Sequence, residues 1–227
     1  MSAEVCILSV DTALGACSVA LLAGERILAR RHVEMDRGHA EVLAPMVDEA
    51  MREAQLPFQA LERLAVTIGP GTFTGQRVGL AFMRALKVAL NIPCLGVTTL
   101  AAMAAEAAAE TNAEVVVAAH DARRGEVYCG VYQNDGQVLL PPTLLTWRDA
   151  ADVVARIAGG VRQFELRDVP GAVVGVDIVI AHLRLADRGI GQAAAEHRQR
   201  PRLARREQPC ARHLLHALGR EIGRAHV

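Results

Sequence analysis

The chain opens with short apolar runs separated by glycines, a pattern that predicts three strands. These strands are expected over residues 5–10, 16–22 and 26–33. Gly15 and Gly24 stand at the two breaks, where turns need residues that tolerate unusual backbone conformations. The beginning of the chain is therefore predicted to be strand-rich.

The next part of the chain alternates helical and extended patterns. A helix is predicted from residue 39 to 54, because Leu43, Val47 and Ala50 recur at helical spacing and share one face. The other elements expected are a strand at residues 64–68, a helix at 75–90, a strand at 93–97 and a helix at 99–110. Three early strands followed by alternating helices and strands predict an α/β fold.

A second unit of similar order begins near residue 113. Asn134, Asp135 and Gly136 form a turn signal between two apolar runs, which predicts a hairpin. The elements expected are strands at residues 115–118, 126–132 and 137–140 and a helix at 147–158. This unit repeats the strand-rich start of the first.

The helix expected at residues 75–90 has an unusually wide apolar arc. Val78, Phe82, Ala85 and Ala89 fall in one sector at 100° per residue, and further apolar residues widen it to roughly 200°. One interpretation is that the helix packs on its own sheet and offers a second apolar flank to another protein. The alternative is that the helix at 39–54 covers this flank, and spacing alone favours neither.

A glycine-rich segment with the sequence GPGTFTGQRVG, residues 69–79, joins a predicted strand to this helix. Its glycines and proline predict a tight turn, and Thr72 or Thr74 could cap the helix. Free backbone N–H groups at such a turn could meet an anion or a partner chain. The alternative is a purely structural turn, since glycine-rich turns are common.

Composition narrows the function classes. The apolar share of 52% predicts a packed core, and the formal net charge of zero gives no global reason to expect nucleic-acid or membrane binding.

The first residues lack a positive n-region and no run reaches the length of a membrane span, so a cytoplasmic location is expected. The cysteines have no CxxC pair and are expected to be free thiols; they are Cys6, Cys17, Cys94, Cys129 and Cys210.

The glycine-rich segment resembles the GPGSFTGLRVG signature of the TsaB (YeaZ) family. These bacterial proteins are needed to make threonylcarbamoyladenosine in tRNA. The resemblance covers roughly residues 5–158. Other stretches that fit the same family are residues 7–12, 17–21, 39–46, 96–100 and 121–128.

The resemblance implies a fold, a function and partners. The fold would be the two-lobed actin-like ATPase superfold, each lobe a mixed sheet with flanking helices, with an N-terminal lobe at residues 1–110 that carries the dimer interface and a C-terminal lobe at 111–227. The function would be that of a non-catalytic scaffold in the complex that forms N6-threonylcarbamoyladenosine at position 37 of tRNAs reading A-starting codons. Its partners would be a TsaD-type catalytic subunit, a TsaE-type ATPase and, through the complex, tRNA, with a homodimer when the partner is absent.

The family pairs through helices of the first lobe, and this implies a set of interface residues. They are His39, Leu43, Met46, Val47, Phe73, Thr74, Arg77, Val78, Phe82 and Met83. No cofactor is assigned to this chain itself; ATP and a divalent metal would act in the complex.

Two turns are candidates for a degenerate nucleotide site. Asp11 and Thr12 end the first strand, where this superfold positions phosphate and Mg²⁺, but only one glycine follows them. Asp121 and Arg123 lie in the corresponding hairpin of the second unit. The alternative reading of Asp11 is a strand-end residue that caps a turn.

Two other functions are compatible with the superfold. A sugar-kinase-type ATPase or phosphotransferase would need a fuller phosphate loop than this chain has. A glycoprotease-like metallopeptidase would need the HxxxH metal motif, and the sequence has no two histidines at that spacing.

Residues 161–227 differ in composition from the rest. They contain twelve arginines, no lysine and seven acidic residues, so this segment has a charge of +5, against −5 for residues 1–160. The interpretations are a basic segment that contacts RNA phosphates, a solvated tail, or a reading frame lost near Gly160. The third is favoured, and resequencing of this region would test it.

Overall fold

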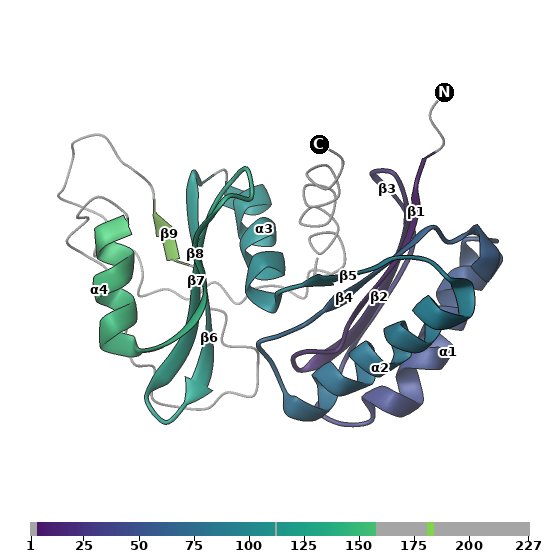
Figure 1. The fold of residues 1–227 in the computed structure, drawn as a ribbon, viewed down its shortest axis with the longest axis horizontal. Helices are drawn as coiled ribbons and strands as arrows, with labels where there is room; N and C mark the ends of the chain where they lie inside the picture. The colour runs from purple at the N-terminus through teal and green to yellow at the C-terminus, as the bar shows by residue number, and fades with distance from the viewer. Residues whose placement is uncertain (1–3, 112, 158–180, 184–227) are drawn as a thin grey trace, which may run out of the picture.

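The computed structural model describes residues 4–111, 113–157 and 181–183, and its fold is mixed α/β. Two sheets are each flanked by helices (Figure 1). The favoured interpretation of residues 161–227 was a lost reading frame. Apart from residues 181–183, these residues lie outside those that the structure describes.

The first sheet is built from the first five strands in the order β3-β2-β1-β4-β5. Strands β1, β2 and β3 are antiparallel neighbours, while β4 and β5 run parallel to β1. All five were expected from the sequence, within one or two residues. Their bounds are Cys6–Asp11 for β1, Ala16–Ala23 for β2, Arg26–Glu34 for β3, Arg63–Thr67 for β4 and Cys94–Val97 for β5.

Helices cover both faces of this sheet (Figure 1). Helix α1 (His39–Glu53) and helix α2 (Phe73–Leu90) lie side by side on one face, and a short 3₁₀ helix, η1 (Phe58–Ala60), precedes β4. Side chains alternate along a strand, so Leu8 of β1 packs under α1 and α2. Its neighbour Ile7 faces the other side, where helix α3 (Thr99–Thr111) lies.

The second sheet has, among the described residues, the strand order β8-β7-β6-β9, and every neighbouring pair is antiparallel. Its strands are β6 (Val115–Arg123), β7 (Glu126–Gln133), β8 (Val138–Thr146) and β9 (Ala181–Leu183). Helix α3 packs on one face and helix α4 (Trp147–Ile157) on the other. Helix α3 therefore lies between the two sheets (Figure 1).

The expected β7–β8 hairpin is confirmed. Gly136 has a φ of 86°, its N–H donates to the carbonyl of Gln133, and the N–H of Gln137 donates to the Asp135 carboxylate. The strand after the turn is longer than expected, because β8 continues through Pro141 and Pro142. These prolines are tolerated since β8 is an edge strand, where a missing N–H need not break a ladder.

Candidate functional site

The glycine-rich turn ends in a capped helix. The Thr72 hydroxyl accepts a hydrogen bond from the Gly75 N–H (3.2 Å), so Thr72, one of the two expected caps, is the N-cap. The helix consequently begins at Phe73, two residues before the expected start. The Thr72 N–H donates to the carbonyl of Ala13 (2.6 Å), which ties the helix start to the β1–β2 turn. The N–H groups of Thr72 and Gly75 are therefore already bonded within the chain.

The glycines of this segment bring two backbones into contact. A Cβ atom on Gly71 would collide with the Ala13 carbonyl, and one on Gly75 would collide with the Thr12 carbonyl. A Cβ on Gly79 would lie 2.5 Å from the Thr12 hydroxyl oxygen. Glycine is required here for close approach, because any larger residue would push helix α2 away from the β1–β2 turn.

The polar groups of the β1–β2 turn form hydrogen bonds within the turn, to strand β4 and to the start of helix α2. The Asp11 Oδ1 atom accepts from the Ala13 N–H (2.9 Å) and from the Thr67 hydroxyl (2.7 Å). The Thr12 hydroxyl donates to the Gly75 carbonyl (2.7 Å). Helix α2 fills the space beside the turn, and the carboxylate already serves as a turn cap. The nucleotide site expected at Asp11 and Thr12 stays a prediction.

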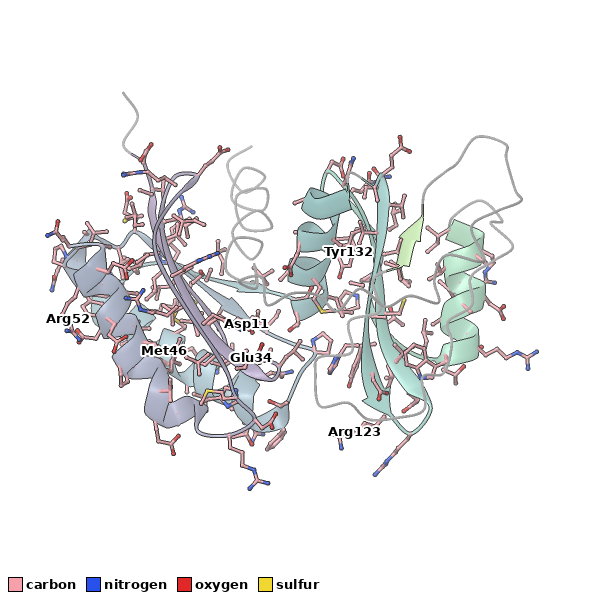
Figure 2. All side chains as sticks on the ribbon, turned by 180° about the vertical axis from the view of Figure 1, so that it is seen from behind. Asp11, Glu34, Met46, Arg52, Arg123 and Tyr132 are labelled. Carbon is pink, nitrogen blue, oxygen red and sulfur yellow. The ribbon has the colours of Figure 1, made fainter. Side chains whose placement is uncertain are left out.

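The second candidate turn, the β6–β7 hairpin, is open to solvent. The Asp121 carboxylate accepts from the Arg123 N–H (2.7 Å), and both residues are exposed. Figure 2 shows Arg123 at the outer end of this hairpin, whereas Asp11 lies among the strands of the first sheet. Asp121 is thus bonded within its own turn, whereas Asp11 is bonded both within its turn and to Thr67 of β4. Burial lowers the pKa of the neighbouring His120, with Asp121 opposing and Arg123 adding to that shift.

The outward face of helix α2 carries exposed apolar side chains. Phe73 is 70% exposed and Val88 is 81% exposed. The Arg77 guanidinium lies 3.5 Å from the centre of the Phe73 ring, a cation–π contact. The other exposed residues of this face are Thr74, Ala81, Arg84, Ala85, Lys87 and Ala89.

The structure divides the ten interface residues expected from the sequence. Phe73, Thr74 and Arg77 are exposed, and Val78 and Phe82 are half-buried against the core under α1 and α2. The other five are buried: His39, Leu43, Met46, Val47 and Met83. Leu43, Met46, Val47 and Met83 belong to the core that α1 and α2 form with the first sheet, and His39 is a buried polar residue at the start of α1.

The structure shows which part of the wide apolar arc of α2 is buried. The arc runs from Ala81 to Met83, and the fully buried positions of the helix are Gly75, Gly79 and Met83, towards one edge of it. These three share one side of the helix at intervals of four residues. That spacing is the signal that could have identified the buried face, since glycine lets a helix approach a sheet closely. Helix α1 covers part of the remaining arc, and Val88 was missed as a surface residue.

The outward face of helix α1 is acidic and largely ion-paired. Arg31 of β3 pairs with Glu49 (3.6 Å) and Glu53, and Arg52 pairs with Asp48 (2.7 Å). These are exposed pairs, so each contributes at most about 1 kcal/mol to stability. Because Glu49 and Glu53 share the single Arg31, this face keeps a net negative charge.

The described part of the chain shows no metal centre: no three His, Cys, Asp or Glu side chains lie where they could hold one ion. In the same residues, no helix combines the length and apolarity needed to cross a bilayer. The four described cysteines are free thiols, as expected.

Comparison with known proteins gives consistent results. The family model described as TsaD, tRNA N6-adenosine threonylcarbamoyltransferase, matches residues 31–178. The tRNA threonylcarbamoyladenosine biosynthesis protein TsaB of Escherichia coli K12 is 40% identical over 130 residues, which are 57% of this chain and 55% of that protein. The TsaB protein of Haemophilus influenzae is 40% identical over 123 residues, 54% of this chain and 51% of that protein. The chain spans about half the length of the curated relatives it matches.

Two solved structures are also similar. YeaZ from Pseudomonas aeruginosa is 39% identical with a TM-score of 0.57, and the match covers 63% of this chain and 67% of YeaZ. A second structure from Pseudomonas aeruginosa, described as similar to peptidase YEAZ, is 38% identical with a TM-score of 0.59 over the same shares. The matched part of this chain therefore shares its fold with these proteins.

Proposed function

We propose that this chain, which belongs to the TsaD family of tRNA N6-adenosine threonylcarbamoyltransferases and within it to the TsaB (YeaZ) group, is a non-catalytic partner subunit. It would take part in the complex that forms N6-threonylcarbamoyladenosine at position 37 of tRNAs reading A-starting codons. Its relatives are named as tRNA threonylcarbamoyladenosine biosynthesis proteins, which supports this assignment.

The observation that carries the proposal is the outward face of helix α2. Phe73 and Val88 are the two most exposed large apolar side chains in the described residues, and both lie on this one helix. Large exposed apolar groups near an exposed arginine are typical of the few residues that dominate a protein interface. The start of the helix is held in place by the Thr72 cap and by the hydrogen bond from the Thr72 N–H to the β1–β2 turn. Such a surface suits a scaffold that holds a catalytic subunit.

The finer features of the proposal follow from the family. The lobes would be those of the actin-like ATPase superfold, with residues 1–110 carrying the interface and the second lobe beginning at residue 111. The antiparallel three-strand order β3-β2-β1 recurs as β8-β7-β6, which supports this. The transfer of threonylcarbamoyl to adenosine would take place on a TsaD-type subunit. ATP and a divalent metal would be held in the complex, with a TsaE-type ATPase and tRNA as further partners in the cytoplasm.

The two alternative functions are not favoured. A sugar-kinase-type ATPase would have to admit phosphate at the β1–β2 turn, where Gly71 and Gly75 are in backbone contact with Ala13 and Thr12. The TsaB proteins of Escherichia coli and Haemophilus influenzae are named for tRNA modification, which does not favour a metallopeptidase.

The test is a binding measurement with the TsaD-type subunit of the same organism. The double variant Phe73→Ala/Val88→Ala should weaken a one-to-one complex at least about tenfold, measured by titration calorimetry. The control is Val138→Ala/Leu144→Ala, which removes two exposed apolar side chains from β8. If the wild-type chain forms no complex, the proposed function is overturned. If both double variants weaken the complex equally, a specific role of the outward face of α2 is refuted.

A further inference from the structure

Strand β8 is a long edge strand without charge. In the part of the chain that the structure describes, no strand pairs with its outer edge, and its nine residues span about 30 Å. No charged residue occurs from Gly136 to Trp147, and the strand exposes the apolar side chains of Val138 and Leu144. An apolar edge of this length is a template for pairing with another chain.

The corresponding edge of the first sheet is protected by charge. Strand β3 has four charged side chains among its nine residues, Arg26, Arg30, Arg31 and Glu34. Charged side chains on an edge strand oppose its pairing with another strand. Strand β5, at the opposite edge, has only four residues and offers little to pair with. Strand β8 has neither charge nor short length, so any protection of its edge has to come from its backbone.

Two consecutive prolines interrupt the backbone of β8. Pro141 and Pro142 are exposed, and together they stand opposite the single residue Gly130 of β7, which makes a β-bulge. The Pro141 carbonyl accepts a hydrogen bond from the Thr143 hydroxyl of the same strand (2.7 Å). Successive N–H groups of a strand point to opposite edges, so one of two consecutive prolines removes an outward donor whichever register another strand adopts.

These prolines lie where two copies of β8 would meet. A symmetric antiparallel pair of the whole strand, Val138–Thr146, has its twofold axis at the middle residue, Pro142. Both copies would therefore bring their prolines to the axis, where neither copy could donate a hydrogen bond. The pairing would lose its central bonds and keep only short flanks on either side.

We infer that Pro141 and Pro142 prevent β8 from pairing edge to edge with β8 of a second copy of this chain. Without them, the second sheets of two molecules would join into one continuous sheet. A second copy is the expected occupant of the edge, because an uncharged strand meets no charge repulsion from its own copy and both copies would cover part of Val138 and Leu144. This inference is independent of the proposed function, which concerns the face of α2.

The test restores the missing donors and then adds a charge. Pro141→Thr/Pro142→Val places two strand-forming residues with N–H groups at the bulge. The same variant with Leu144→Lys carries a charge on the strand, and Pro57→Thr, which replaces an exposed proline before η1, is the control. Mass is measured by size exclusion with light scattering over a concentration series, and amide hydrogen exchange is measured for residues 143–146.

The double variant should have about twice the mass of the wild-type species, and its amides at residues 143–146 should exchange about tenfold more slowly. Leu144→Lys should restore the wild-type mass, and Pro57→Thr should leave it unchanged. A double variant with the mass and exchange of the wild type would overturn the inference. Association or loss of soluble protein that Leu144→Lys does not reverse would also overturn it, because misfolding rather than pairing of β8 would be the cause.

Discussion

The β1–β2 turn and the β6–β7 hairpin occupy corresponding places in their sheets, yet they have opposite environments. In the first, Asp11 and Thr12 are bonded to residues far along the chain, at Thr67 and Gly75. In the second, Asp121 bonds only to its own turn, at Arg123. The two aspartates, at corresponding topological positions, therefore have different roles. Helix α2 packs onto the first turn and closes it, while the end of the second hairpin is exposed.

The glycines of the two turns show the same contrast. Gly75 is needed because a remote backbone lies against it, whereas Gly125 has no atom within 4 Å of where its Cβ would be. Gly125 is needed instead for its backbone, since its φ is 78°. One glycine serves tertiary packing and the other serves local conformation.

The largest effect is expected for Gly75→Ala. Helix propensity alone favours alanine by about 1 kcal/mol, but the new Cβ would collide with the Thr12 carbonyl, so we expect a net loss of about 3 kcal/mol in the free energy of unfolding. Gly125→Ala should cost only about 1 kcal/mol, for its left-handed conformation. Urea denaturation of both variants measures the difference, and equal losses would show that the two turns do not differ as described.

Removal of each aspartate should give a smaller contrast. Asp11→Ala leaves the buried Thr67 hydroxyl and the Ala13 N–H without their acceptor, which should cost about 2 kcal/mol. Asp121→Ala exposes the Arg123 N–H to water and should cost about 0.5 kcal/mol or less. Denaturation curves of the two variants compare them directly. A loss at Asp121 as large as that at Asp11 would contradict the open environment of the hairpin.

His120, beside the second hairpin, should contribute to pH dependence. Burial lowers its pKa below the usual 6.5, so the unfolded chain takes up a proton at higher pH than the folded chain does. Its contribution to stability is complete above about pH 6.5 and is lost as the pH falls towards the folded-state value. His120→Gln should therefore flatten the stability profile between pH 7 and pH 5. An unchanged slope in denaturation midpoints over that range would refute this.

The smallest effect is expected at the tip of the second hairpin. Arg124 has a φ of 56°, a left-handed conformation that is unfavourable for a residue with a side chain. Arg124→Gly should relieve this and raise the free energy of unfolding by about 0.5 kcal/mol, because the two turn residues then both suit a positive φ. The thermal midpoint should rise by a few degrees or less. A lower midpoint would mean that the Arg124 side chain stabilises the hairpin.

The sequence predicted most of the elements and part of the site. The three opening strands, α1, β4, β5 and the β7–β8 hairpin were placed within a few residues, because each has a clear period or turn signal. The ends of β6 and β8 were set too early, at residues 118 and 140, since pairing with β7 extends both strands beyond their apolar runs. Phe73 was identified as a surface residue, but Val88 and the burial of Met83 were not.

The sequence by itself determined the order of elements, the capped glycine-rich turn and the family to which the chain belongs, because these depend on neighbouring residues. Only the tertiary structure decided which side of α2 is buried and which aspartate turn is closed. Both depend on Gly75 and Gly79, whose missing side chains let the helix reach Thr12. A sequence does not show whether a glycine is needed for a positive φ or for a close backbone contact. Only the residue packed against it distinguishes these two roles.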